Sequence, residues 1–398
     1  MLLYVLETVL FLPWTCLMLC ARYYTFEVKT KRNGVVESYL DKNGITYENI
    51  TAQTSDGYVL TMQVLGPKDG EPVFVLHGMF ESSAMTLAHG LESLPILLSK
   101  KGYKVYLGNV RGNMYGLKHA TLSPWMNKFW NFSVRQHGML DFPAMISTIK
   151  TLNKNKKITV IGQSQGALVS LMGLSASSSL NKSIKKIILL SPALVLRTPT
   201  NPLVNMVFKM NPAWLGDPLY FSFVAITQLF IPDFVANFFA FTALEASGMS
   251  LLPLDREGAG YVMASTPSGF LPCDGMRFYI ELLEKGEDFY KDKNGKLGGF
   301  DLSKVSVEVC LWIGSDDVVI DTEKTVNLLK DCMGSRLSYF IVLEGYGHTD
   351  SWYSKDSMER LTPDVIRVIE GKKGGERKER GGRSKSRSRS RSKSKKRS

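Results

Sequence analysis

Cysteine is scarce in this chain, with five among 398 residues. The five form no C-x-x-C pair and have no histidine at metal-ligand spacing, so the sequence predicts neither a disulfide framework nor a zinc site. Biased composition is also missing from most of the chain, since hydrophobic residues make up 44% and charged residues 22%. This balance is typical of a globular protein with a sizeable core, and it excludes a wholly disordered or collagen-like chain.

An excess of one charge is missing from the body of the chain, although the net charge is +12. Residues 372–398 hold 14 Lys+Arg and 2 Asp+Glu, and the rest of the chain holds 35 of each. The folded domain therefore has no surface-wide basic field. Residues 371–398 are rich in Arg, Ser and Lys and carry no apolar side chain, which predicts a disordered tail.

The function of this tail is open from the sequence. Its charge fits anionic lipid or nucleic acid as partners. Phosphorylation between Ser384 and Ser394 would cancel much of the charge and would act as a switch. The alternative is a solvated tail without a specific partner.

The N-terminal residues 1–28 predict a hydrophobic membrane anchor. Met1 to Ala21 are apolar apart from Glu7 and two threonines, and no Lys or Arg precedes Arg22. Basic residues follow, so the positive-inside rule predicts that the chain after this segment lies in the cytoplasm, on endoplasmic reticulum or a lipid droplet. One alternative is a buried helix. The other alternative is a cleaved signal on a secreted or lysosomal protein. Three N-x-S/T sequons would suit that alternative, although this composition also produces such sequons by chance: Asn49, Asn131 and Asn181.

Strand and helix signals alternate through the middle of the chain. This alternation predicts an α/β protein with a mostly parallel central sheet covered on both faces. The core is expected in residues 29–191 and 301–370, and residues 192–300 break the rhythm and predict a helical cap or lid insertion. The expected strands are Tyr58–Leu65, Val73–Leu76, Lys104–Leu107, Ile158–Ile161, Ile187–Leu190, Val307–Ile313 and Tyr339–Leu343, and the expected helices between them include Leu91–Lys100, Phe142–Leu152 and Gln165–Leu174.

One turn in this pattern has the chemistry of a nucleophile. Residues 162–166 read G-Q-S-Q-G and join a strand to a helix. The glycines permit the strained turn that exposes the serine, so Ser164 is the candidate nucleophile. The alternative is a serine that caps an ordinary helix.

A serine needs a base, an orienting acid and oxyanion donors. Among five histidines, His348 is the candidate base because it lies in a glycine-flanked loop after a late strand. Asp316 or Asp317 follows the preceding strand and could orient it, and Asp321 is a less favoured choice. The backbone N–H groups of Met79 and Gln165 are the candidate oxyanion donors. His77 opens the turn before Met79 and is expected to shape it.

Six stretches of the chain together match the pattern of a known family. They are VFVLHGMFESSA (73–84), GYKVYLGNVRGNMYGLKH (102–119), FWNFSVRQHGMLDFPAMI (129–146), IGQSQGALVS (161–170), LWIGSDDVVID (311–321) and GHTD (347–350). Through these stretches the sequence resembles the acid-lipase branch of the α/β-hydrolases, which includes gastric and lysosomal acid lipases and membrane-anchored fungal steryl ester hydrolases. The resemblance implies an α/β-hydrolase fold and Asp317 as the acid, and it supports Met79 and Gln165 as oxyanion donors. Gln163 departs from the His or Phe that is usual in the elbow.

These signals together predict a serine carboxylic ester hydrolase that cleaves a neutral lipid, triacylglycerol or steryl ester, at a membrane or lipid-droplet surface. Its chemistry requires no cofactor or metal, and no obligate protein partner is inferred. The apolar run Leu203–Leu252 predicts a lid over an acyl-binding cleft, with cap core or a second membrane span as alternatives. Two other functions stay open: a carboxylesterase on smaller esters, and a non-catalytic membrane scaffold that uses the basic tail.

Overall fold

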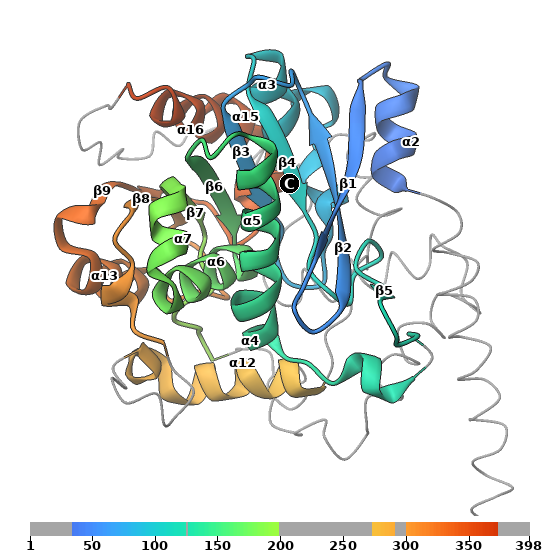
Figure 1. Ribbon diagram of the computed structural model, residues 1–398. Coiled ribbons are helices and arrows are strands. Elements are labelled where there is room, and N and C mark those ends of the chain that lie inside the picture. Colours follow the sequence, from blue (N-terminus) through green and yellow to red (C-terminus); the bar gives the residue numbers. More distant parts are fainter. Residues whose placement is uncertain (1–33, 125, 199–272, 291–299, 373–398) are drawn as a thin grey trace, which may run out of the picture.

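The computed structural model describes residues 34–124, 126–198, 273–290 and 300–372 (Figure 1). The predicted anchor (1–28), most of the predicted cap (192–300) and the tail beyond residue 372 lie outside these ranges. Within the described ranges, no helix is both long enough and apolar enough to cross a membrane. The description below therefore concerns the predicted core and the two ends of the insertion.

A nine-stranded sheet forms the centre of the described part of the chain (Figure 1). Its strands lie in the order β1-β2-β4-β3-β6-β7-β8-β9, and β5 pairs with β2. Neighbouring strands from β4 to β9 are parallel, whereas β2 is antiparallel to β1, β4 and β5. The predicted mostly parallel sheet is confirmed. The strands are β1 (Tyr47–Gln53), β2 (Tyr58–Leu65), β3 (Pro72–Leu76), β4 (Lys104–Gly108), β5 (Lys118–His119), β6 (Ile158–Gln163), β7 (Ile184–Leu190), β8 (Glu308–Gly314) and β9 (Leu337–Leu343).

The central strands are apolar on both faces, as the strand β3 illustrates. All five of its residues are buried. Phe74 and Leu76 belong to one hydrophobic cluster, and Val73 and Val75 belong to the other. Successive side chains point to opposite faces of a strand, so a short continuous apolar run places residues in two separate cores.

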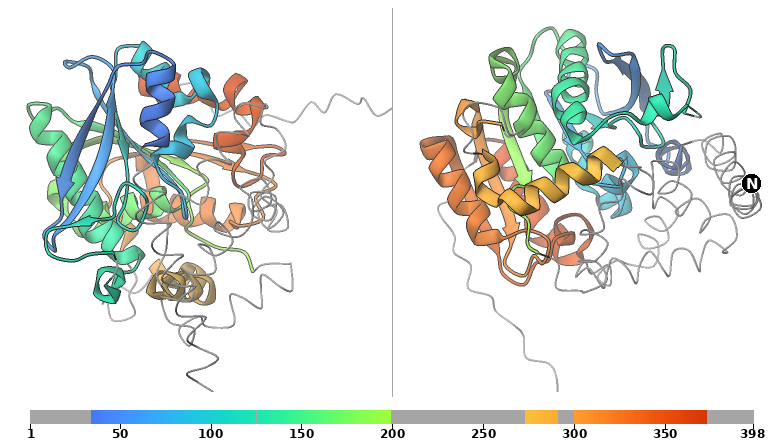
Figure 2. Two further views of the ribbon diagram at one scale, coloured as in Figure 1. Left: turned by 90° about the vertical axis from the view of Figure 1, so that its right-hand side faces the viewer. Right: turned by 90° about the horizontal axis from the view of Figure 1, so that it is seen from below.

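Helices cover both faces of the sheet (Figures 1 and 2). The helices α2, α3, α14 and α16 contribute to one hydrophobic cluster, and α5, α6, α7 and α13 contribute to the other. This is the layered arrangement expected for a parallel sheet. The helices are α2 (Val35–Lys42), α3 (Leu94–Lys100), α4 (Val134–Gln136), α5 (Phe142–Leu152), α6 (Gln165–Ala176), α7 (Ser178–Ser183), α12 (Cys273–Lys285), α13 (Thr322–Met333), α14 (Asp350–Tyr353), α15 (Lys355–Glu359) and α16 (Leu361–Ile369).

The edge strand β1 is a departure from the sequence analysis, which expected no strand there. Its sequence is YENITAQ, and only Ala52 is buried. Without a buried apolar run, the strand gives no hydrophobic signal, and its pairing with β2 over seven residue pairs stabilises it instead. The short strand β5 was not predicted either, and the remaining seven strands lie where the sequence predicted them, within three residues at each end.

The two ends of the insertion are fixed to the core near the carboxyl edge of the sheet, beside α12 at the bottom of Figure 1. The hydroxyl of Tyr290 donates to the carbonyl of Leu194 at 2.6 Å and so joins the two ends directly. The departing segment is also paired with the loop after β8, through Arg197 N–H to Val319 O at 2.8 Å and Asp321 N–H to Val195 O at 2.8 Å.

Candidate active site

Ser164 occupies the turn between β6 and α6 in a strained backbone conformation, with φ 48° and ψ −111°. Its backbone N–H donates to Leu190 O at 2.9 Å, which fixes the turn against β7. No side chain fits at Gly162 or Gly166, because an added Cβ would lie 2.6 Å from Ala167 N and 2.4 Å from Leu76 O respectively. The glycines and the positive φ thus form the sharp strand-to-helix elbow that the sequence predicted.

His348 and Asp317 lie next to this serine, each in the loop after a parallel strand. His348 Nε2 is 2.9 Å from Ser164 Oγ, and His348 Nδ1 is 2.8 Å from Asp317 Oδ2. All three residues are buried. With Nδ1–H donating to the carboxylate, Nε2 is left as an acceptor for the serine proton.

The structure separates the three aspartates that the sequence left open. Asp317 Oδ1 accepts the N–H groups of Val319 and Ile320 at 2.9 and 2.8 Å, which orients Oδ2 toward the histidine. Asp316 is exposed and accepts a hydrogen bond from the neighbouring Ser315 hydroxyl. Asp321 caps the N-terminus of α13. Of these three aspartates, only Asp317 contacts His348.

The loop after β3 carries the candidate oxyanion donor Met79. Gly78 lies close to Gln163 in this loop: an added Cβ would lie 2.3 Å from Gln163 Oε1, so the glutamine side chain would have to move. His77 shapes the turn as expected: Nδ1–H donates to Gly78 O at 2.8 Å, and Nε2 accepts from Asn113 at 3.0 Å. Burial lowers the pKa of His77 to about 4, so the ring is neutral at pH 7. The other candidate donor, Gln165 N–H, is in the first turn of α6, where backbone N–H groups have no acceptor within the helix.

Two further contacts in the site were missed by sequence reasoning. Glu81, in the loop after β3, accepts a hydrogen bond from Tyr353, which follows the histidine loop. The side chain of Gln165 accepts from Tyr279 of α12 at 2.6 Å and lies 3.4 Å from His137 Nδ1. These partners are far apart in the chain, so no local pattern indicated them.

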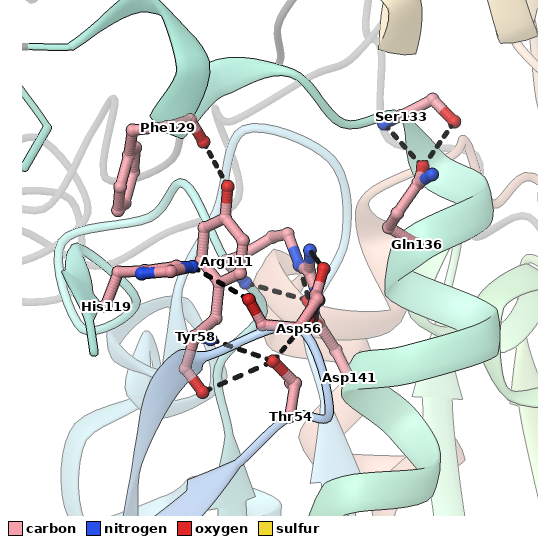
Figure 3. A network of polar contacts seen from close by, with 9 residues as sticks. All are labelled: Thr54, Asp56, Tyr58, Arg111, His119, Phe129, Ser133, Gln136 and Asp141. Carbon is pink, nitrogen blue, oxygen red and sulfur yellow. Dashed lines mark hydrogen bonds and ion pairs between the residues drawn. The ribbon is translucent and has the colours of Figure 1, made fainter. Parts of the chain in front are cut away.

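A second polar cluster, here called the Arg111 network, surrounds the buried guanidinium of Arg111 (Figure 3). Two nitrogens bind the carboxylate of Asp56 at 2.6 and 3.0 Å, and Nε binds Asp141 at 2.7 Å. The backbone N–H of Arg111 also donates to Asp141 at 3.0 Å. The ring of Tyr58 lies under the guanidinium, 3.9 Å from its carbon, and the Tyr58 hydroxyl donates to Phe129 O. The network joins β2 and the turn before it to two of the matching stretches noted in the sequence, those that contain the G-N-V-R-G-N run and the F-W-N-F-S run.

Burial and charge pairing act in opposite directions on the ionisation of this network. Burial would lower the pKa of Arg111, but the charges and hydrogen bonds of Asp141 and Asp56 raise it. Burial opposes the ionised form of Asp56, yet its hydrogen bonds to Arg111 and Thr54 outweigh this and lower the pKa of Asp56. Burial raises the pKa of Asp141 to about 6, and Arg111 limits that rise. The guanidinium therefore stays charged and stabilises both carboxylates.

Comparison with known proteins identifies the family. A family model of the α/β hydrolase fold matches residues 71–355, and a model of a partial α/β-hydrolase lipase region matches residues 36–90. Because the first match covers more than half of the chain, the protein belongs to the α/β-hydrolase fold family.

Individual relatives are lipases at modest identity. Lipase member K from Homo sapiens is 25% identical over 356 residues, covering 82% of this chain and 88% of that protein. Lipase 3 from Drosophila melanogaster is 27% identical over 365 residues, covering 83% of this chain and 91% of that protein. Among solved structures, naproxen esterase from Bacillus subtilis shares the fold, with a TM-score of 0.51 and 14% identity, covering 86% of this chain and 97% of that chain.

These matches confirm three predictions from the sequence: the resemblance to the acid-lipase branch, the α/β-hydrolase fold and the class of enzyme, a carboxylic ester hydrolase.

Proposed function

We propose that the protein is a serine lipase that hydrolyses the ester bond of a neutral lipid. The observation that supports this most directly is the continuous hydrogen-bond chain from Ser164 Oγ through His348 to Asp317, with distances of 2.9 and 2.8 Å. The chain ends at a hydroxyl on a strained elbow, which is the geometry that nucleophilic catalysis requires.

In this mechanism Ser164 Oγ attacks the carbonyl carbon of the ester while His348 Nε2 takes the hydroxyl proton. Asp317 keeps the imidazole in the correct orientation and stabilises its positive charge. The proton then passes from His348 to the leaving alcohol, and an acyl-enzyme remains. Water, deprotonated by the same histidine, attacks the acyl-enzyme and releases a fatty acid and the free serine.

The negative charge that develops on the ester oxygen needs fixed donors. We assign this role to the backbone N–H groups of Met79 and Gln165. Two donors of this kind stabilise the tetrahedral intermediate without reorganising in each cycle, and the loss of one side-chain donor typically costs about 10²–10³ in kcat.

Triacylglycerol and steryl ester are the proposed substrates, taken from a membrane or lipid-droplet surface. The names of the relatives and the apolar run Leu203–Leu252 in the insertion support a lipid substrate. The N-terminal segment 1–28 is proposed as the membrane anchor that holds the enzyme at this surface. The basic tail, with net charge +12 over residues 372–398, is proposed as an electrostatic contact to anionic lipid.

The test is release of fatty acid from emulsified triolein and cholesteryl oleate by the detergent-solubilised full chain and by Ser164→Ala. We expect release from at least one substrate and its loss in the variant. Ser175→Ala is the matched control: Ser175 also lies in α6 and is buried, but its hydroxyl donates to Met172 O and takes no part in the proposed chemistry. This control should keep the activity of the wild type.

Other results would point to the other functions. Turnover of p-nitrophenyl butyrate without release from either lipid would support a carboxylesterase on smaller esters. Full activity of Ser164→Ala would overturn the proposed nucleophile. If the folded wild type hydrolyses none of the three esters, a non-catalytic scaffold would be favoured.

A further inference from the structure

Glu81 connects the two loops that carry the proposed catalytic groups. Its Oε2 accepts the backbone N–H of Gly78 at 2.7 Å, within the loop after β3. Its Oε1 accepts the hydroxyl of Tyr353 at 2.8 Å, across 272 residues of sequence. Tyr353 ends α14, the short helix that begins two residues after His348. One carboxylate thus bridges the oxyanion loop and the histidine loop.

The bridge determines which donors the oxyanion loop can offer. Because Glu81 occupies the N–H of Gly78, that group is withdrawn from any substrate. The next N–H in the chain, that of Met79, has no hydrogen-bond acceptor among the described residues. The side chain of Glu81 therefore holds the loop in the conformation that leaves Met79 as the free donor.

The charge of Glu81 also acts on the site. Burial raises the pKa of Glu81, while the hydrogen bonds from Tyr353 and Gly78 and the positive charge of protonated His348 act in the opposite direction. Electrostatic interaction is mutual, so ionised Glu81 stabilises the protonated imidazole. Burial, followed by the charge of Glu81, raises the pKa of Tyr353, so this hydroxyl remains a donor.

We propose that Glu81 is a positioning residue for ester hydrolysis, which orders the oxyanion loop through Gly78, ties it to the histidine loop through Tyr353, and stabilises the positive charge that His348 gains in the transition state. This proposal rests on the function proposed above. It adds a third carboxylate to the surroundings of His348, besides Asp317, which binds Nδ1, and Asp350, which accepts Gly347 N–H in the same loop. The exposed Asp316 is a further negative charge in this region.

The charge role is tested with Glu81→Gln, because glutamine has the same shape and can still accept from Gly78 but has no charge. The measurement is the pH profile of kcat/KM for p-nitrophenyl butyrate, with the full chain in detergent. We expect the ascending limb to move to lower pH by about half a unit to one unit and kcat to fall about tenfold with KM unchanged, because the protonated imidazole loses stabilisation.

Glu308→Gln is the matched control. It removes the same charge at the first residue of β8, at the opposite end of that strand from the loop that carries Asp317, where Glu308 accepts from Ser338. Its pH profile should equal that of the wild type. Glu81→Asp keeps the charge on a shorter side chain, so its ascending limb should stay in place even if kcat falls.

The outcomes separate this proposal from the proposed function. If wild type is active, Ser164→Ala is inactive and folded Glu81→Gln has the profile and kcat of wild type, only the role of Glu81 is overturned. If Glu81→Gln fails to fold, the pH profile of Glu81→Asp is the deciding measurement. An ascending limb that moves to a different pH in this variant, which keeps the charge, would overturn the charge role. If wild type is inactive, or Ser164→Ala stays active, the proposed function itself fails.

Discussion

The proposed catalytic triad and the Arg111 network are both buried polar clusters of this protein, and both contain aspartates that orient a cationic or basic partner. They differ in where their hydrogen bonds end. In the Arg111 network every strong donor of the guanidinium meets a carboxylate, and the cluster is closed (Figure 3). In the triad the hydrogen bonds run from Asp317 through His348 to the hydroxyl of Ser164. In the proposed mechanism this hydroxyl gives up its hydrogen bond when it attacks the substrate.

The difference between the two clusters shows that the most distinctive sequence motifs are not those that carry the proposed chemistry. The G-N-V-R-G-N and F-W-N-F-S runs are more distinctive than G-Q-S-Q-G, yet the structure uses them to build the closed cluster. A closed cluster of ions fixes the relative position of segments and stabilises them only when all partners are present. In this protein the distinctive runs therefore belong to the scaffold, and the short elbow carries the proposed nucleophile.

Asp317→Asn should have the largest effect in this comparison, a loss of about 10⁴-fold in kcat/KM. The amide NH₂ would donate to His348 Nδ1 and force the proton onto Nε2, which could then no longer accept from Ser164. The folded structure should persist, because the asparagine carbonyl can still accept from Val319 and Ile320. The measurement is p-nitrophenyl butyrate turnover together with thermal unfolding. Asp316→Asn is the control and should stay within twofold of wild type; an equal loss there would contradict the assignment of Asp317.

Arg111→Met should affect stability, with the free energy of unfolding falling by about 3–5 kcal/mol. The substitution leaves the carboxylate of Asp141 buried without its cation. Urea unfolding followed by fluorescence measures the loss. The double variant Arg111→Met/Asp141→Asn should recover part of it, because the uncompensated charge is gone and the asparagine can still accept the backbone N–H of residue 111. No recovery would show that packing around the guanidinium, and not charge, dominates.

Acid should destabilise the protein through two histidines that, unlike His348, are buried without an acidic partner in the described structure. Burial lowers the pKa of His77 to about 4 and that of His137 well below 6.5. Below about pH 6.5 the unfolded chain binds protons that the folded state does not, so stability falls with decreasing pH by about 1.4 kcal/mol per unit for each histidine.

This effect is measured by urea unfolding of wild type and His137→Gln between pH 7.5 and 5. In the variant, the slope of the free energy of unfolding against pH should be smaller by the contribution of one histidine. Equal slopes in the two proteins would refute the interpretation.

Tyr58→Phe should have the smallest effect, about 1–2 kcal/mol in the free energy of unfolding. Burial raises the pKa of Tyr58 to about 12, so the hydroxyl is a donor, and its removal leaves the carbonyl of Phe129 without that hydrogen bond. The ring stays under the guanidinium. Esterase activity of the folded variant should equal that of wild type. A loss of activity at unchanged stability would mean that the Arg111 network acts on the triad directly.

Local signals explain which parts of the fold could be predicted. Buried apolar runs and the glycine elbow are local, so the parallel strands and the position of Ser164 followed from the sequence. The polar edge strand β1 has no such run. The pairing of Glu81 with Tyr353, or of Gln165 with Tyr279, depends on how distant segments pack, which no spacing along the chain encodes. Asp316 and Asp317 are neighbours with the same side chain, so the local pattern left both open. The family resemblance implied Asp317, and the fold buries Asp317 and exposes Asp316.

The hydrogen bond between Tyr290 and Leu194 has a consequence for evolution. It joins the two ends of the predicted insertion at the core. The points at which the intervening chain is attached therefore do not depend on its length. The entropy of closing such a loop rises slowly, by about 0.6 kcal/mol for each doubling of its length. Changes in the length of the chain between these two points, outside the paired residues Val195 and Arg197 and the helix α12, therefore cost little in loop-closure entropy, so this region can diversify among descendants while its attachment points stay fixed.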